Sequence, residues 1–243
     1  MKSYKTEGII IKRRNFGETD RMLTIYTKEY GKIEALAKGA RKSLSKLGGH
    51  IELFYRSDFV IHEGRNIDLV IGAQLANSFS HLQTSSELTN SAYYLSELLY
   101  RSTGENIENR QIYYLLNQVL VKLNKQSYQK LLCYFELKLF SNLGHEPQID
   151  VCAHCHKKIQ EKAVFDYREG GSLCMDCAKM SVDPLYLSPN ATKLVRIIRK
   201  QPLDFLNRVI ISDELISTLS QCTRQMRQCI LERPLNCEKY MQL

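Results

Sequence analysis

Apolar and polar residues alternate with a period of two through most of the first 75 residues. In residues 22–26, for example, Leu23 and Ile25 would face one side of a strand and their neighbours the other. Such segments predict five strands, within residues 8–12, 22–26, 33–38, 53–61 and 67–71. Five short strands suit a small closed barrel, because closure leaves few free edges. One long basic loop among them favours an OB-fold, although an SH3-like barrel would show the same periodicity.

Beyond residue 74 the apolar period changes to about 3.6, which is typical of amphipathic helices. Ser188-Pro189 pairs an N-cap residue with proline at the first helical position, and a last helix is expected from about Ser212. Cys222 and Cys229 fall on the apolar face of that helix, so we expect both to be buried. Earlier helices, which together predict a helical bundle, are indicated by apolar stripes in residues 88–99, 112–123 and 128–139.

The change of period divides the chain into an N-terminal barrel and a helical remainder. Residues 150–180 interrupt the helical pattern and hold four of the eight cysteines. We therefore predict a multidomain α+β protein, with an OB-fold domain in residues 1–78 and an α-helical domain in residues 79–243. The cysteine-rich segment 150–180 would be an insertion embedded in the helical domain.

The composition is that of an ordinary folded protein, with 44% hydrophobic and 25% charged residues. These fractions exclude collagen-like, low-complexity and largely disordered classes. No apolar run approaches the roughly 20 residues that a membrane helix needs. The first residues also lack the apolar segment of a secretory signal. We therefore expect a cytoplasmic protein that does not associate with membranes.

The chain is basic, with a formal net charge of +8, and the excess is uneven along it. Residues 1–80 hold 14 basic and 9 acidic side chains, whereas residues 81–150 hold 6 and 7. A concentration of positive charge at the N-terminus favours a dedicated face for a polyanion such as nucleic acid. Charge alone leaves open a lysine-rich surface that only aids solubility.

Four cysteines form two C-x2-C pairs, Cys152 with Cys155 and Cys174 with Cys177, separated by 18 residues. Two such turns can place four thiolates around one tetrahedral Zn²⁺, and residues 163–173 supply a hairpin between them. Four protein ligands leave no position for water. We therefore expect one structural zinc ion rather than a catalytic metal.

Three other roles are open to these cysteines. Paired disulfides require an oxidising compartment, of which the sequence gives no sign. A thioredoxin-type redox pair needs only one C-x2-C, and the C-x-x-C-H pattern that ends at His156 matches haem c attachment, which requires export. Both would leave the second pair without a role. His154 or His156 could replace one cysteine as a ligand, but four cysteines at matching spacing need no substitute.

A glycine-rich basic loop follows the third predicted strand. Residues 38–50 contain three glycines, two serines and no acidic residue. The glycines allow the backbone to approach a phosphate chain, and the serine hydroxyls can donate to it. The loop lacks the GxxxxGK[ST] pattern, so it does not indicate a nucleotide site. A solvated mobile loop is the alternative. Aromatic residues that could stack bases beside it are Phe16, Tyr26, Tyr30, Tyr55 and Phe59, of which we expect fewer than half to do so.

No constellation of residues indicates an enzyme. Glu18 and Asp20 are two residues apart, but no histidine, serine or cysteine partner lies nearby in a recognisable hydrolase motif. A turn-capping role or a salt bridge to Arg21 is the better interpretation of this pair. The sequence also lacks a nucleophile elbow, an HExxH motif and a GxGxxG motif.

The N-terminal residues resemble a known family. The start of the chain is similar to that of the RecO family of bacterial DNA repair proteins, in TEGIII at residues 6–11, Arg13 and FGETD at residues 16–20. The similarity continues in Gly31-Lys32 and in the loop 38–46. The order of barrel, helices, four-cysteine module and further helices also agrees. RPL at residues 233–235 resembles the family's closing motif. The resemblance spans the whole chain.

The resemblance implies a recombination mediator that is not an enzyme. Such proteins bind single- and double-stranded DNA and anneal complementary strands. With RecR they help RecA to replace the single-strand-binding protein on gapped DNA, in the cytoplasm at the nucleoid. The implied DNA contacts are Arg13, Arg14, Lys38, Arg41, Lys42 and Lys46. The implied ligands of one structural Zn²⁺ are Cys152, Cys155, Cys174 and Cys177.

Two other functions stay open. In a protein-interaction adaptor, the nearly neutral helical middle would bind partners and the basic surface would bind DNA only weakly. A nuclease or other phosphoryl-transfer enzyme would need clustered carboxylates that bind Mg²⁺, and turnover without partners would reveal it.

Overall fold

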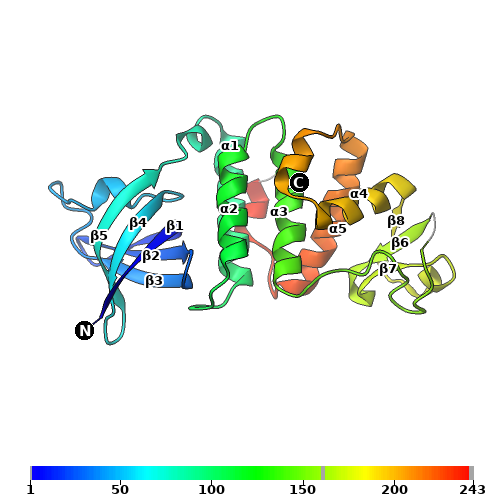
Figure 1. The fold of residues 1–243 in the computed structure, drawn as a ribbon, viewed down its shortest axis with the longest axis horizontal. Coiled ribbons are helices and arrows are strands. Elements are labelled where there is room, and N and C mark those ends of the chain that lie inside the picture. Colours follow the sequence, from blue (N-terminus) through cyan, green and yellow to red (C-terminus); the bar gives the residue numbers. More distant parts are fainter. Residues whose placement is uncertain (1, 160–161, 241–243) are drawn as a thin grey trace. The chain divides into compact units, whose positions relative to one another are not determined.

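The computed structural model describes residues 2–159 and 162–240, which form two compact units (Figure 1). The first unit consists of Met1–Lys125 together with Leu235–Gln242, and the second of Gln126–Pro234. The domain limits expected at residues 78, 150 and 180 stay predictions. Across the described part of the chain, no helix has both the length and the apolar character needed to cross a bilayer.

The first unit is built on a closed five-stranded barrel. Its strands are β1 (Ser3–Phe16), β2 (Asp20–Thr27), β3 (Gly31–Ala37), β4 (Arg56–His62) and β5 (Asp68–Asn77). The order around the barrel is β1-β2-β3-β5-β4, and β1 pairs with β4 to close it. Neighbouring strands are antiparallel except β3 and β5, which pair in parallel over two residues. This arrangement confirms the predicted OB-fold.

The predicted alternation places the core side chains correctly. Ile10 pairs with Ile25, and Ile25 with Ile33, so branched side chains meet across three strands inside the barrel. The predicted strand at residues 53–61 begins late, because Phe54 adopts a positive φ of 69° and breaks the extended backbone. The buried core of the barrel is Ile10, Leu23, Ile25, Ile33, Ala35, Ala37, Ala40, Ile51, Phe59, Ile61 and Val70.

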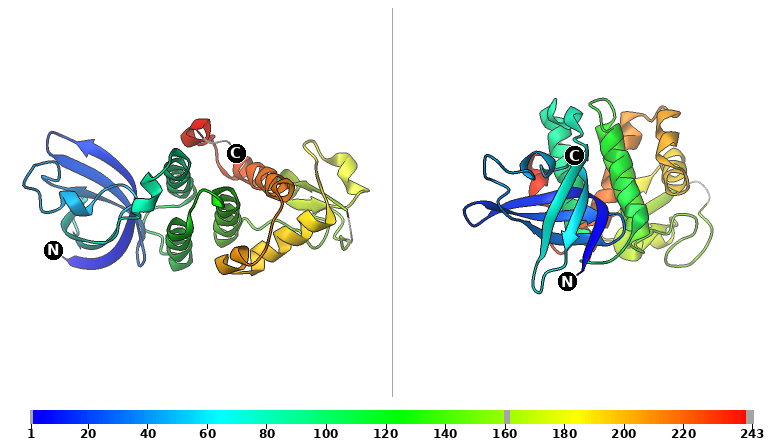
Figure 2. Two further views of the ribbon diagram at one scale, coloured as in Figure 1. Left: turned by 90° about the horizontal axis from the view of Figure 1, so that it is seen from above. Right: turned by 60° about the vertical axis from the view of Figure 1, so that its left-hand side comes forward.

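Two helices and the C-terminal turn complete the first unit. They are α1 (Ser86–Ser102), α2 (Arg110–Lys122) and the 3-10 helix η6 (Asn236–Tyr240). Ser85 and Asn109 cap the first turns of α1 and α2 with their side-chain oxygens. The helices pack outside the barrel (Figures 1 and 2), so β2 is buried on both faces from Met22 to Thr27.

The second unit combines three helices with a small sheet. The helices are α3 (Tyr128–Asn142), α4 (Pro189–Lys200) and α5 (Asp213–Ile230), and the strands are β6 (Ala163–Asp166), β7 (Gly171–Leu173) and β8 (Leu185–Leu187). The sheet order is β7-β6-β8. The predicted cap at Ser188 is confirmed, since its hydroxyl accepts a hydrogen bond from the N–H of Ala191. The predicted helix start at Ser212 is also confirmed, and this residue accepts one from the N–H of Leu215.

The helices of the second unit pack around a buried ion pair. Arg227 of α5 and Glu136 of α3 pair at 7% and 3% side-chain exposure. Such a pair is costly to break, because one charge would be left buried without a partner. Cys222 is buried as predicted, but Cys229 is exposed. The prediction for Cys229 was wrong because it lies one residue from the end of α5, where the helix face turns to solvent.

Candidate nucleic-acid interface and metal centre

The basic loop, residues 38–50, is fastened to the barrel at both ends, and at its far end His50 accepts hydrogen bonds from Ser57 and Leu75. The backbone N–H of Gly39 donates to Asp20 Oδ1 at 2.8 Å, and the N–H of Arg41 donates to the carbonyl of Thr19 at 2.9 Å. The Arg41 guanidinium adds a bond to the carbonyl of Glu18 at 2.9 Å. These bonds join the loop to the β1–β2 turn, so the exposed end of β1 and the loop form one surface.

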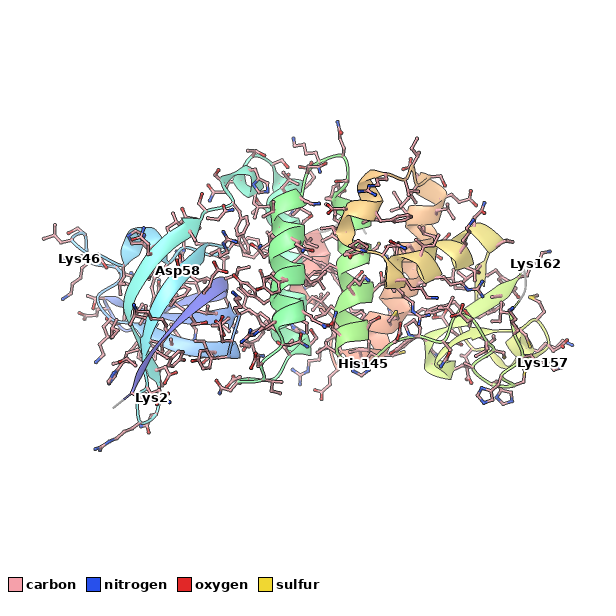
Figure 3. All side chains as sticks on the ribbon, viewed as in Figure 1. Lys2, Lys46, Asp58, His145, Lys157 and Lys162 are labelled. Carbon is pink, nitrogen blue, oxygen red and sulfur yellow. The ribbon has the colours of Figure 1, made fainter. Side chains whose placement is uncertain are left out.

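Between these ends most loop side chains are exposed, apart from Leu47, which packs against the barrel core. Leu44 is 94% exposed, and Figure 3 shows Lys46 extending away from the barrel. The exposed cations are Lys38, Arg41, Lys42 and Lys46. Within the described residues, none of these four cations lies within 4.0 Å of a carboxylate. The loop therefore presents positive charge that the protein itself does not neutralise.

The carboxylate of Asp20 is part of the loop's anchor. Hydrogen bonds from the Gly39 N–H and the Thr19 hydroxyl lower its pKa, and the nearby charges of Lys38 and Lys42 act in the same direction. Asp20 thus stays ionised and holds the turn, which supports the turn-capping interpretation. Arg21 bonds elsewhere, to Glu52 at 2.8 Å.

The two predicted contacts on β1 differ from each other. Arg13 is ion-paired with Glu52, and Arg21 shares the same carboxylate, so two cations are partly neutralised by one anion. Arg14 is exposed and lies over the ring of Phe16, 5.9 Å from its centroid. The structure therefore brings Arg14 to the exposed surface, whereas Arg13 is held in an ion-pair cluster.

Few of the candidate stacking residues are available. Tyr26 and Phe59 are each 1% exposed, so they belong to the core. Tyr30 is exposed in the β2–β3 turn, where its ring contacts that of Tyr4. This turn lies at the opposite end of β2 from the basic loop. Phe16 is 41% exposed at the end of β1, next to the turn that anchors the loop. Among the five candidates, Phe16 has the position that a stacking platform beside the loop requires.

The Gly31-Lys32 pair has a structural role that the sequence did not reveal. Lys32 is 6% exposed, and its Nζ donates to the carbonyls of Tyr100, at 2.7 Å, and Thr103 at the end of α1. Its burial lowers its pKa, against the opposing effect of nearby carboxylates. Gly31 has φ +67°, and a Cβ there would lie 1.9 Å from the carbonyl oxygen of Ile107. The pair therefore docks the helices on the barrel. In the sequence, only its resemblance to the family pattern indicated that it is important.

The four predicted cysteines form one cluster. The sulfurs of Cys152, Cys155, Cys174 and Cys177 all lie within 4.8 Å of one another. Cys155 Sγ and Cys174 Sγ are 3.7 Å apart, too far for a disulfide. Four sulfurs at about 2.3 Å from a tetrahedral zinc ion lie roughly 3.8 Å apart. The cluster therefore fits a single metal ion and accounts for both C-x2-C pairs.

Local structure holds the two cysteine turns together. The N–H of His156 donates to the carbonyl of Cys152 at 2.9 Å, and the N–H of Ala178 donates to that of Cys174 at 2.9 Å. The N–H of Ala153 donates to the carbonyl of Ser172 in β7 at 2.8 Å, which ties the first turn to the sheet. His154 and His156 are exposed and outside the cluster.

The electrostatics of the cluster favour a cation. Burial would raise the pKa of Cys152, but N–H groups of Cys155, Cys174 and His154 hydrogen-bond to its sulfur and lower that pKa to about 6. Burial and contacts with the other sulfurs raise the pKa of Cys177 to about 12. Four sulfurs at this distance repel one another when ionised, so the fully ionised set needs a divalent cation at its centre.

Comparison with known proteins identifies the chain. The family model described as Recombination protein O N terminal matches residues 1–79, and that described as Recombination protein O C terminal matches residues 85–237. A DNA repair protein RecO from Dehalococcoides mccartyi is 34% identical over 234 residues, which cover 95% of this chain and 91% of the relative. One from Roseiflexus is 37% identical over 232 residues, covering 95% and 82%. One from Pelotomaculum thermopropionicum is 29% identical over 241 residues, covering 99% and 94%. The chain belongs to the RecO family of DNA repair proteins.

Proposed function

We propose that this protein is a recombination mediator that binds single- and double-stranded DNA and anneals complementary strands. With RecR, it would help RecA to displace the single-strand-binding protein from gapped DNA at the nucleoid. These steps rearrange nucleic acid and protein partners without making or breaking covalent bonds. The role proposed here is therefore not enzymatic.

The observation that carries the proposal is the exposed, unpaired positive charge of the basic loop. Lys38, Arg41, Lys42 and Lys46 lie on one segment that contains no carboxylate, and Arg14 lies at the end of β1 beside the anchoring turn. Cations without an internal counter-charge can neutralise phosphates and release counterions. Neutralisation of both strands would reduce their mutual repulsion, which is the main physical barrier to annealing.

For the cysteine cluster we propose one Zn²⁺ held by Cys152, Cys155, Cys174 and Cys177. Zinc prefers four sulfur ligands in tetrahedral geometry, and a complete set of protein ligands makes the ion structural. When bound, the ion would supply cross-links between the two cysteine turns. Elemental analysis of a tag-free preparation should find one zinc per chain, and its absence would refute this assignment.

Reconstitution with purified partners tests the mediator function. RecA ATPase activity is measured on single-stranded DNA that is coated with the single-strand-binding protein. We expect activity to rise only when this protein and RecR are both added, because each alone should leave the coat in place. A Lys42→Glu variant should stimulate less than wild type, and a Lys5→Glu variant should stimulate as wild type does.

DNA binding and partner binding are measured separately, so a failure to stimulate RecA can be assigned to one step. If the protein binds DNA but does not stimulate RecA with RecR, the loading step is refuted and the binding function stands. Tight partner binding combined with weak DNA binding would instead support the adaptor function.

A further inference from the structure

The first unit contains a second candidate site, outside the basic loop. A cleft of about 650 Å³ is lined by residues of β1, α1 and η6, and most of its surface is apolar. Its volume lies within the roughly 300–1,000 Å³ typical of small-molecule sites. We call it the β1–α1 cleft, and its lining includes Ile11, Lys12, Leu53, Tyr93, Ser96 and Tyr100.

Tyr93 brings an aromatic ring to the lining of this cleft. The residue is 48% exposed, and its ring is nearly perpendicular to that of Phe54, with a centroid distance of 5.1 Å and an interplanar angle of 82°. Phe54 is itself buried, so the edge contact holds the tyrosine ring in place. A half-exposed tyrosine ring that is held in place can stack on any of the four bases.

Ser96 lies in the floor of the cleft. Its residue is 2% exposed, and its Oγ, which has no hydrogen-bond partner among the described residues, exposes less than 1 Å² of surface. The hydroxyl is therefore not open to a ligand, and the cleft offers its aromatic rings and its cation instead.

The charges around the cleft match a single phosphate. Arg13 is ion-paired with Glu52, and Arg101 with Glu97 at 2.8 Å. Lys12 has no carboxylate partner among the described residues, and its Nζ lies 4.0 Å from the centroid of the Tyr100 ring. One cation without a counter-charge suits one nucleotide. An acidic peptide would bring several carboxylates to a cleft that already contains that of Glu97.

We propose that the β1–α1 cleft binds one unstacked base of single-stranded DNA. Tyr93 stacks on the base, and Lys12 contacts an adjacent phosphate. This inference rests on the proposed DNA-binding function and adds to it a site that recognises the base rather than the backbone. A strand held there would be kept open at one nucleotide while the basic loop contacts its phosphates.

The test separates base from backbone contacts. Binding of wild type, Tyr93→Ala and Tyr93→Phe is measured by fluorescence anisotropy with oligo(dT) of about 15 nucleotides and with an abasic strand of the same length. Tyr93→Ala should weaken binding to oligo(dT) by roughly 5- to 140-fold and leave binding to the abasic strand unchanged, because the variant cannot stack a base but still meets the phosphates. Tyr93→Phe keeps the ring and should bind both strands as wild type does.

The outcomes distinguish failure of the cleft inference from failure of the proposed DNA-binding function. If wild type binds neither strand, the proposed DNA-binding function fails. If wild type binds both and Tyr93→Ala changes neither, or changes both equally, the cleft inference is overturned while DNA binding stands. An acidic peptide as the natural occupant would give this second pattern.

Photo-crosslinking covers the case in which Tyr93→Ala does not fold. Wild-type protein is irradiated with a strand that carries 5-iododeoxyuridine, and the modified residue is identified by mass spectrometry. Crosslinks to Tyr93 or Tyr100 support the inference. Crosslinks confined to residues 38–50 contradict it.

Discussion

The two units stabilise their sheets in different ways. In the first unit, strands of up to 14 residues close into a barrel with a continuous apolar core. In the second, β6, β7 and β8 have only 4, 3 and 3 residues, so the sheet depends on the structure that surrounds it. The cysteine cluster lies at the turns beside this sheet, and a bound metal ion would supply cross-links there. We infer that the barrel needs no metal and that the small sheet depends on one.

The largest effect should follow removal of one metal ligand. Cys174→Ser is expected to destabilise the second unit by more than about 3 kcal/mol, because a structural zinc ion contributes folding free energy directly. Hydrogen exchange followed by mass spectrometry should show reduced protection in residues 163–187 and normal protection in β1–β5. Cys229→Ser, an exposed cysteine outside the cluster, is the matched control. Unchanged protection in Cys174→Ser would mean that the sheet does not depend on a metal.

The next effect tests how the helices of the first unit are docked. Gly31→Ala should reduce the free energy of unfolding by about 3 kcal/mol, since it combines a positive φ with a clash against the Ile107 carbonyl. Gly17 also has a positive φ, of 59°, but no atom lies within 4 Å of a Cβ placed there. Gly17→Ala should therefore cost only about 1 kcal/mol in the same urea titration. Equal reductions for the two variants would contradict the docking role of Gly31.

A smaller effect is expected from reversing one charge in the basic loop. Lys42→Glu should weaken binding to single-stranded DNA by roughly 10-fold and reduce the slope of log K against log salt by about 0.7 for each phosphate that the variant no longer neutralises. Lys5→Glu makes the same charge change near the start of β1, at the other end of that strand from the loop anchor, and should bind nearly as wild type does. Identical slopes for Lys42→Glu and wild type would exclude Lys42 as a phosphate-binding residue. Arg41→Glu is less clean, because Arg41 also anchors the loop.

The smallest effect concerns the ion-pair cluster of Glu52. Burial opposes ionisation of Glu52, but its bonds to Arg21 and Arg13 outweigh burial and lower its pKa. Glu52 therefore stabilises the fold above about pH 4.5, and this contribution is lost as the pH falls through the lowered pKa. In thermal melts at a series of pH values, Glu52→Gln should reduce the loss of stability at acidic pH. Because the variant also frees two arginines, it should bind DNA about two-fold to three-fold more tightly. An unchanged loss of stability at acidic pH would show that the pair contributes nothing to stability.

Local patterns in the sequence predicted the features that depend on local structure. Alternation gave the barrel strands, cysteine spacing gave the cluster, and Ser188 and Ser212 marked two helix starts. Features that depend on distant pairing were missed. Arg13 looked like a free cation because Glu52, 39 residues away, bonds to it only in the fold. Likewise, Tyr26 lies on the face of β2 opposite Leu23 and Ile25, yet it is 1% exposed, and the alternation of residues did not predict that burial.

Annealing of two complementary, fluorescently labelled oligonucleotides tests the central claim most directly. The reaction is followed at low and moderate salt, with no nucleotide or metal added, for wild type and for Lys42→Glu and Lys5→Glu. We predict that wild type and Lys5→Glu accelerate annealing, more strongly at low salt, and that Lys42→Glu accelerates it several-fold less. Failure of the folded wild-type protein to accelerate annealing at either salt concentration would contradict the proposed strand-annealing function.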